Sequence, residues 1–219
     1  MASPPAKLLW QATHRDKVNT WKRNGRLRAR ILAIYVYSNG MMACEKCGVT
    51  EFSFLTLDHI NGGGTSHRLT DRRANCKMPH LLKSQGFPVG YRVLCQNCNF
   101  KTYITSIIPG QSYRSQAVRR HRISLKARVL TAYAGEPAQC AMCDESDLHV
   151  LTIDHIMGGG REEMNKLGLK GGSEYYRKLI HDGYPKGFQV LCFNHNSGKR
   201  VLSPTIGFIR KTLASWTGP

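Results

Sequence analysis

Acidic residues are scarce in this 219-residue chain, which has 14 aspartates and glutamates against 32 lysines and arginines and a formal net charge of +18. A charge of this size and sign attracts a polyanion or an anionic membrane surface. Long apolar runs are missing as well, since no stretch approaches the roughly 20 apolar residues of a transmembrane helix. Together these features make nucleic acid the leading partner and argue against a membrane protein.

A secretion signal is also missing from the sequence. The N-terminal residues MASPPAKLLWQATHRDK contain too short an apolar run for a signal peptide, which argues against export and against an oxidising compartment. We therefore expect a soluble protein inside the cell. In that setting the eight cysteines are expected to bind metal rather than to form disulfides.

The chain contains an internal repeat. LTLDHINGGG at 55–64 returns as LTIDHIMGGG at 151–160, an offset of 96 residues. Agreement over several separated blocks in one order indicates a duplicated module. We expect module one at 1–104, a linker at 105–114 and module two at 115–219. The other matching blocks, at offsets of 96 to 98, are CEKC with CAMC, GFPVGYRVLCQNCN with GYPKGFQVLCFNHN, and LRARILAIY with LKARVLTAY.

The pattern of apolar residues predicts the same elements in each module. Apolar residues at three- and four-residue steps, with basic residues between them, predict a leading helix. Short runs of β-branched and aliphatic residues predict two strands, the first ending at a Gly-Gly-Gly turn. Segments 65–85 and 161–182 are expected to form short helices and loops. The predicted helices are RARILAIYVY and KARVLTAYA, and the predicted strands are FLTLDHI, YRVLC, VLTIDHI and FQVLC.

Seven of the eight cysteines fall into two sets of four candidate metal ligands, completed by one histidine. A two-residue gap brings both sulfurs of a CxxC turn to one ion, and imidazole replaces thiolate readily in such closed sites. Four ligands leave no open position, so we expect one structural zinc ion in each module. Cys76 is left over and is assigned no role. The sets are Cys44, Cys47, Cys95 and Cys98 in module one, and Cys140, Cys143, Cys192 and His195 in module two.

An Asp-His pair at a predicted strand end lies between the two halves of each zinc site, and an asparagine directly follows the last ligand. With the CxxC turn, the GGG turn and the segment GxxxGxxVLCxxC(H)N, these residues resemble the HNH, or His-Me finger, nucleases, specifically their zinc-containing phage-type branch. The resemblance covers 27–100 and 125–200. It implies an α+β fold of two tandem ββα-metal modules, each with a structural zinc knuckle, plus basic helices.

The resemblance also implies a role for each of these residues. The histidines would be general bases, the aspartates the first ligands of one catalytic ion per module, and the asparagines its second ligands. Histidine can deprotonate water near neutral pH, and Mg²⁺ or Mn²⁺ held by such oxygens acts as a Lewis acid. We expect phosphodiester hydrolysis leaving 5′-phosphate and 3′-hydroxyl ends, with zinc as scaffold only. The residues are Asp58, His59 and Asn99 in module one, and Asp154, His155 and Asn196 in module two.

Basic residues cluster ahead of each module and are expected to contact the phosphates of double-stranded DNA. His67 and Arg68, which follow the first GGG turn, are further candidates for a phosphate contact, whereas module two has Glu163 and Met164 there. Two modules in one chain would let a monomer of pseudo-two-fold symmetry address both strands. The basic candidates are Arg23, Arg26, Arg28 and Arg30 before module one, and Arg119, Arg120, Arg122, Lys126 and Arg128 before module two.

Several functions fit these observations. A site-specific homing endonuclease in the cytoplasm of a bacterial or phage-infected cell is the first hypothesis, because phages commonly carry small HNH proteins of this kind. A restriction endonuclease is close behind, and a chain with one active module would be a strand-specific nickase. The hypothesis from another class is a non-catalytic zinc protein that binds nucleic acid. It treats Asp-His as a buried hydrogen-bonded pair and leaves the repeated Asp-His and asparagine unexplained.

Overall fold

The computed structural model describes residues 10, 13–71, 77–107, 113–199, 201 and 203–218. The side chain of Arg68, and Cys76 altogether, lie outside this description. The chain divides into two compact units, one formed by Met1–Val93 with Ser203–Pro219 and the other by Leu94–Leu202. The expected modules at 1–104 and 115–219 follow the sequence repeat and stay a prediction, whereas the compact units divide inside a strand and place the C-terminal segment in the first unit.

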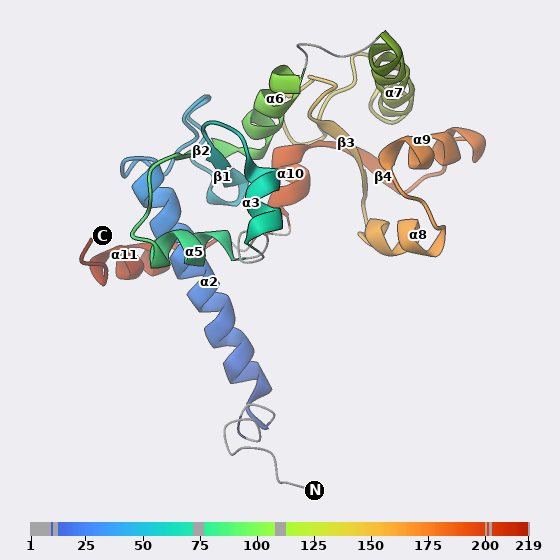
Figure 1. Cartoon of the computed structure of the whole chain (residues 1–219). Helices are drawn as coiled ribbons and strands as arrows, with labels where there is room; N and C mark the ends of the chain where they lie inside the picture. The colour runs from blue at the N-terminus through green and yellow to red at the C-terminus, as the bar shows by residue number, and fades with distance from the viewer. Residues whose placement is uncertain are drawn as a thin grey trace, which may run out of the picture. The chain divides into compact units, whose positions relative to one another are not determined.

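The long helix α2 carries the core of the first unit (Figure 1). Its apolar stripe buries Ile31, Leu32 and Ile34, and it packs against β1, α5 and the C-terminal helix α11. The packing of α11 on α2 places the end of the chain in this unit, which the sequence pattern did not predict. The elements are α2 (Arg15–Tyr37), η1 (Phe52–Phe54), β1 (Leu55–His59), α3 (Gly64–Thr70), α5 (Met78–Ser84), β2 (Tyr91–Cys95) and α11 (Ile206–Ala214).

In the second unit, α7 packs against both strands of a hairpin and against α9. Leu130 of α7 is buried in one cluster with Leu151 and Leu191 of the hairpin, and Val129 is buried with Tyr175 and Leu179 of α9. Adjacent residues of α7 thus serve two parts of the core. The elements are α6 (Gln96–Ile107), α7 (Tyr113–Ala134), β3 (Leu151–His155), α8 (Gly160–Lys166), α9 (Gly172–His181), β4 (Phe188–Cys192) and α10 (Phe193–Gly198).

Within the described ranges the strands form two two-stranded sheets, β1 with β2 and β3 with β4. The antiparallel register of the second sheet places Asp154 opposite Gln189 and His155 opposite Phe188. Both strands of each repeat lie where the sequence pattern predicts them, and a helix follows the second strand directly. The mixed α+β class is therefore confirmed. No helix in the described part of the chain is both long and apolar enough to cross a membrane.

Helices α6 and α10 are joined by a reciprocal pair of hydrogen bonds inside the second unit. The backbone N–H of Asn97 donates to Oδ1 of Asn194, and the backbone N–H of Asn194 donates to Oδ1 of Asn97, both at 3.0 Å. The two asparagines are 6% and 9% exposed, and they occupy equivalent positions of the repeat. Each side chain therefore satisfies a backbone N–H at the start of the other helix that no helical carbonyl could accept.

Candidate functional site

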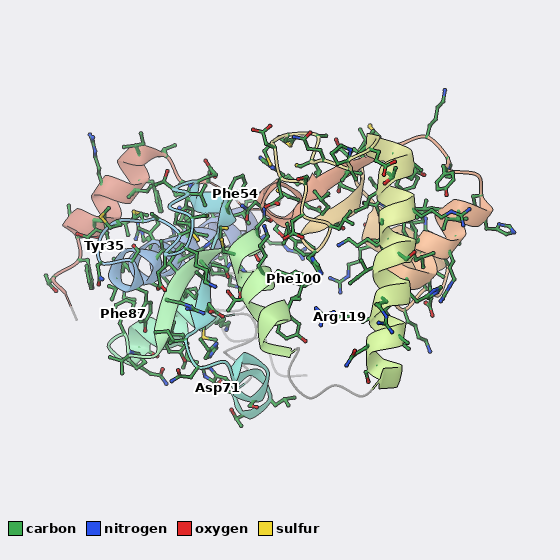
Figure 2. All side chains as sticks on the ribbon, turned by 90° about the horizontal axis from the view of Figure 1, so that it is seen from above. Tyr35, Phe54, Asp71, Phe87, Phe100 and Arg119 are labelled. Atoms are coloured by element: carbon green, nitrogen blue, oxygen red, sulfur yellow. The ribbon has the colours of Figure 1, made fainter. Side chains whose placement is uncertain are left out.

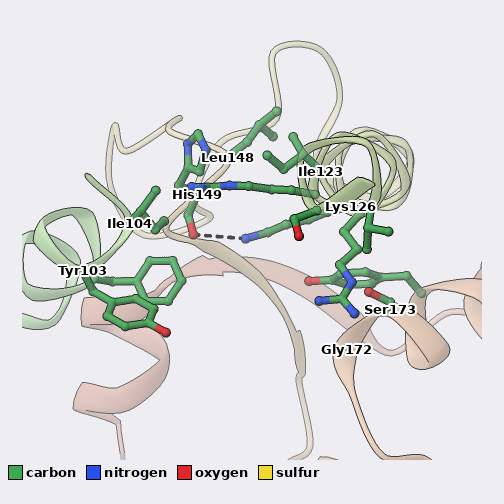
Figure 3. A pocket seen from close by; sticks show the side chains of 14 residues that line it. Tyr103, Ile104, Ile123, Lys126, Leu148, His149, Gly172 and Ser173 are labelled. Carbon is green, nitrogen blue, oxygen red and sulfur yellow. Dashed lines mark hydrogen bonds between the residues drawn. The ribbon is translucent and has the colours of Figure 1, made fainter. Parts of the chain in front are cut away.

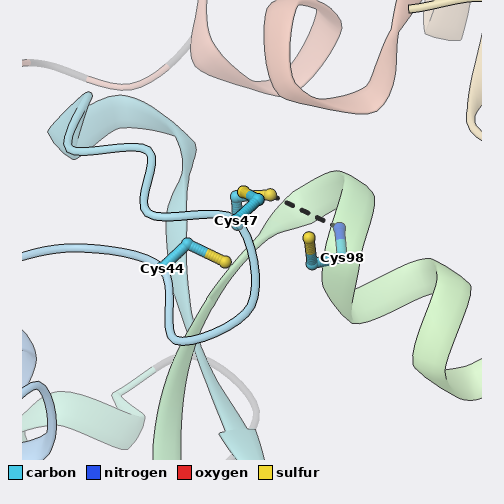
Figure 4. Close-up of side chains that lie close together, drawn as sticks. Cys44, Cys47 and Cys98 are labelled. Carbon is cyan, nitrogen blue, oxygen red and sulfur yellow. Dashed lines mark hydrogen bonds between the residues drawn. The ribbon is translucent and has the colours of Figure 1, made fainter.

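Among the residues that the structure describes, two groups of side chains could hold a metal ion. In each group the four ligand atoms lie within 4.8 Å of one another. The first contains four cysteines, of which the N–H of Cys98 also donates to Sγ of Cys95 at 3.4 Å (Figure 4). Both groups match the sets that the CxxC spacing predicts, and both could hold a structural zinc ion. They are Cys44, Cys47, Cys95 and Cys98, and Cys140, Cys143, Cys192 and His195.

The distances in the second group fit tetrahedral zinc. Zinc–sulfur bonds of about 2.3 Å place two sulfurs about 3.8 Å apart, and Sγ of Cys143 and Sγ of Cys192 are separated by 3.9 Å. Nδ1 of His195 lies 3.3 Å from Sγ of Cys192. Burial lowers the pKa of His195, which favours the neutral imidazole that a metal requires. Burial raises the pKa of the Cys143 thiol to about 12, so a cation would have to displace its proton.

The Asp-His-Asn set of the second repeat comes together around one pocket. Asp154 and His155 lie at the end of β3, Asn196 lies on α10, and all three line a pocket of about 280 Å³. Asp154 is 5% exposed and His155 is half-buried. Residues 42 positions apart in the sequence thus meet because β4 returns beside β3 and leads directly into α10.

His155 is held by two side chains that the sequence pattern did not indicate. Its Nε2 lies 2.5 Å from Oε2 of Glu163 and 2.7 Å from the hydroxyl of Tyr175, which donates to the same Glu163 oxygen at 2.8 Å. Although burial opposes its ionisation, hydrogen bonds with His155 and Tyr175 hold the pKa of Glu163 below its ordinary value. Burial, reinforced by Glu163, raises the pKa of Tyr175. The imidazole is therefore paired with a carboxylate and a neutral phenol.

Asp154 is engaged by two neighbours. The side-chain amide of Gln189 donates to its Oδ2 at 3.0 Å, as the strand register requires. The ammonium group of Lys199, at the end of α10, forms an ion pair with its Oδ1. The negative charge of this buried carboxylate is thus balanced by a lysine, and a catalytic cation would have to replace or join that ammonium group.

The Gly-Gly-Gly turn after β3 uses its glycines for two different reasons. Gly158 and Gly159 have φ angles of +77° and +82°, a left-handed backbone that glycine adopts without steric cost. Gly160 has no such angle, but a Cβ built on it would lie 2.5 Å from Nδ1 of His155. The third glycine therefore leaves room for the imidazole.

The first repeat surrounds its Asp-His pair with different partners. Asp58 accepts a hydrogen bond from Nε of Arg92 at 2.9 Å. Nε2 of His59 lies 2.9 Å from Nδ1 of His67, and the Tyr91 hydroxyl lies 3.4 Å from that same Nδ1. His67, considered above as a phosphate contact, is thus the neighbour of the candidate base. Asn99 lies half-buried on α6, in the second compact unit.

Some of the side chains that contact the candidate bases could have been recognised from the internal repeat. Glu163 and His67 stand at the same position of the repeat, 96 residues apart, so aligning the two repeats could have suggested that one position supplies the partner of the candidate base. Tyr175 and Lys199 carry no comparable signal. They lie 20 and 45 residues from the groups they contact, and only the folded chain brings them there.

The basic candidates for DNA contact divide into exposed and enclosed side chains. Arg23, Arg120 and Arg122 are exposed. Arg30 is partly enclosed, and its guanidinium donates to the carbonyl oxygens of Phe52 and Leu55 at 3.2 and 2.7 Å. Burial lowers its pKa. Arg30 therefore holds the segment at the start of β1 against α2. The sequence of a basic helix face does not show which of its basic side chains points inward.

The buried amine of Lys126 on α7 is expected to lower the free energy of unfolding by a measurable amount. Burial lowers its pKa to about 8, although Nζ donates to the carbonyl of His149 at 3.2 Å. Below pH 8 the amine is charged in both the folded and the unfolded protein, and the folded protein bears the full cost of desolvating the charge. Between the folded pKa and the ordinary pKa only the unfolded protein holds the proton. The free energy of unfolding therefore rises with pH in that range. Lys126→Met is expected to raise the free energy of unfolding at pH 7 by about 2 kcal/mol.

The measurement is urea unfolding at pH 7 and at pH 10, followed by circular dichroism. The advantage of Lys126→Met over the wild type should shrink at the higher pH. Lys186→Met, at an exposed loop position, is the matched control and should change stability by less than about 0.5 kcal/mol. Equal stability of wild type and Lys126→Met at pH 7 would contradict the prediction.

The site therefore consists of two four-ligand groups, one pocket that gathers Asp154, His155 and Asn196, and a second Asp-His pair with partners of its own. These groups have the chemistry to hold two structural ions and to position an imidazole beside a carboxylate. No family model, curated protein or solved structure matches this chain.

Proposed function

We propose that the chain is a metal-dependent DNA endonuclease with two HNH-type sites, one in each repeat, supported by two structural zinc ions. The observation that carries the proposal is the pocket in which Asp154, His155 and Asn196 come together. A general base, a carboxylate and an amide oxygen around one small cavity are the groups that phosphodiester hydrolysis needs. The biological role that we propose first is homing, with restriction as the alternative.

In this proposal each side chain has a stated task. His155 takes the proton of the attacking water at one ring nitrogen, while Glu163 and Tyr175 hold the ring through Nε2. Asp154 and Asn196 would hold Mg²⁺ or Mn²⁺, which, when bound, supplies Lewis-acid stabilisation of the leaving oxygen. The carboxylate of Glu163 favours the imidazolium that forms on proton transfer. Hydrolysis would leave 5′-phosphate and 3′-hydroxyl ends.

The charge of the chain supports DNA as the substrate. A net charge of +18 favours contact with a polyanion, with affinity that falls as salt rises. Exposed arginines on α2 and α7 provide such contacts, since Arg23, Arg120 and Arg122 reach solvent. Two sites in one chain would let a monomer cut both strands of a duplex.

A second candidate function is a zinc protein that binds nucleic acid without cutting it. The observation that favours it is that both candidate carboxylates are already paired with basic side chains, Asp154 with Lys199 and Asp58 with Arg92. A carboxylate that is neutralised by the protein has less need of a divalent cation. The two functions differ in one measurable respect, which is cleavage in the presence of Mg²⁺ or Mn²⁺.

The test is the conversion of supercoiled plasmid by the full chain, with and without each divalent ion. We expect cleavage that requires the ion and is abolished when His59 and His155 are both replaced by alanine. Ligation of the products by DNA ligase without prior end repair would verify the 5′-phosphate and 3′-hydroxyl ends. Tight, salt-sensitive binding without cleavage of any substrate would replace the nuclease with the binding protein.

Gly160→Ala provides a local test of the second site. The added Cβ would lie 2.5 Å from Nδ1 of His155, so the imidazole has to shift and cleavage at this site should fall by about tenfold or more. The measurement is single-turnover plasmid cleavage, in which the variant should accumulate nicked circles. Gly171→Ala is the matched control, because its Cβ meets nothing within 4 Å, and it should cleave as the wild type does. An unchanged rate for Gly160→Ala would show that His155 is not needed where it stands.

A further inference from the structure

A second cavity lies directly beside the pocket that holds Asp154 and His155. It has a volume of about 750 Å³ and opens between α6, α7 and the start of α9 (Figure 3). Gly172 and Tyr176 line both cavities. These two residues therefore form a wall that the two cavities share.

The walls of this cavity combine aromatic rings with positive charge. Phe100 and Tyr103 project from α6, and α7 contributes Arg119, Arg122 and Lys126. Figure 2 labels Phe100 and Arg119, which come from these two neighbouring helices. Among the described residues that line the cavity, none is an aspartate or a glutamate. The cavity is thus suited to an anion that carries a flat, stacking group.

Two of these side chains differ in how far the fold depends on them. Phe100 packs against Phe193 with ring centroids 4.7 Å apart, so it belongs to the contact between α6 and α10. The ring of Tyr103 lies 6.3 Å from that of Phe100, and the residue is 60% exposed, so part of it faces solvent. Tyr103 is therefore the residue at which binding and folding can be separated.

Lys126 lies at the inner end of the cavity. Its amine donates to the carbonyl of His149 (Figure 3) and lies 5.8 Å from the centroid of the Phe193 ring. Burial of this ammonium group outweighs the attraction of the Asp147 carboxylate, which acts in the opposite direction. Burial lowers the pKa of Lys126 to about 8, and a phosphate in the cavity would offset that cost.

We propose that this cavity takes one unpaired nucleotide of a DNA strand, with its base on Tyr103 and its phosphate towards Arg122 and Lys126, next to the phosphodiester that lies at His155. The inference rests on the proposed nuclease function for the position of that phosphodiester. Aromatic stacking with basic side chains is how proteins hold single-stranded nucleic acid, and enzymes that act on DNA extrude nucleotides into pockets of this kind. The volume falls within the range of about 300–1,000 Å³ of small-molecule sites.

The test measures binding to the zinc-loaded full chain, without Mg²⁺ or Mn²⁺, so that cleavage does not enter. The probe is a single-stranded hexanucleotide that carries one 2-aminopurine, whose fluorescence is quenched when it stacks. We expect quenching by the wild type and by Tyr103→Phe, which keeps the ring. Tyr103→Leu should lose the quenching and weaken binding by about tenfold. Arg122→Gln should weaken binding by about fivefold, whereas Lys186→Gln, at an exposed position that does not line the cavity, should weaken it by less than twofold.

Two results would overturn the proposal. One is equal quenching and affinity for Tyr103→Leu and Tyr103→Phe. The other is displacement of the hexanucleotide by hexaglutamate as efficiently as by unlabelled DNA, which would make the cavity a general site for acidic chains. Failure of the nuclease proposal gives a different pattern, since the hexanucleotide would still bind through Tyr103 while plasmid stays uncut.

Discussion

Removal of metal is expected to unfold the protein, and one cysteine-to-serine change in a cluster is expected to remove one of two zinc ions. In the second cluster the four ligands lie on two segments that are distant in the sequence, the turn with Cys140 and Cys143 and the stretch with Cys192 and His195. Binding of a structural zinc ion is worth on the order of 10 kcal/mol in small zinc domains. That is comparable to the whole net stability of a domain, which is about 5–15 kcal/mol, so loss of the ion is expected to unfold the protein.

The measurement combines metal analysis with thermal unfolding followed by circular dichroism. Wild type should contain two zinc ions per chain and lose its cooperative transition after dialysis against a chelator. Cys192→Ser should contain one zinc ion. Cys76→Ser is the matched control, because each cluster has four described ligands without it, and it should keep both ions. A metal-free protein that unfolds cooperatively at the wild-type temperature would show that the clusters hold no structural ion.

Single replacements of the two histidines are expected to turn a double-strand cutter into a nicking enzyme. If each repeat cuts one strand, His155→Ala and His59→Ala should each leave one active site and accumulate nicked plasmid. Loss of a general base lowers the rate at the altered site by about 10²- to 10⁴-fold. The two variants need not match, because His155 is paired with Glu163 and His59 with His67.

The rates of nicking and of linearisation, followed by gel electrophoresis under single-turnover conditions, check this expectation. His181→Ala is the matched control, since the His181 side chain is exposed at the end of α9, and it should linearise plasmid as the wild type does. Zinc content and DNA affinity should be unchanged in all three variants. Linearisation by His155→Ala at the wild-type rate would remove this residue from the chemistry.

Local sequence patterns were sufficient to predict the strands and the clusters. A strand such as Leu151–His155 is encoded by its own apolar residues and bounded by its glycines. The CxxC turns define their own geometry, because two residues are the right gap for two ligands of one ion. The second pair of ligands in each cluster is then brought beside the first when the hairpin returns. These features are local or repeated, and both properties are visible in a sequence.

The partners of the site could not be predicted in the same way. Tyr175 reaches His155 because α9 packs on α7 through Leu179 and Val129, and Lys199 reaches Asp154 because α10 ends beside β3. Such contacts depend on how helices cross, which the period of apolar residues does not specify. The contact of α11 with α2, which joins distant parts of the sequence, could not be predicted for a related reason.

The reciprocal bonds between Asn97 and Asn194 have the form of an isologous contact, in which the same residue serves on both sides. Between two separate chains such a contact would dissociate on dilution. Here both helices belong to one polypeptide, so its strength is independent of protein concentration. A change at Asn97 alone would leave the N–H of Asn194 without its acceptor, and a matched change would be needed at both positions. Because the module is duplicated, two residues that lie 97 positions apart have to be substituted together if the contact is to be kept balanced.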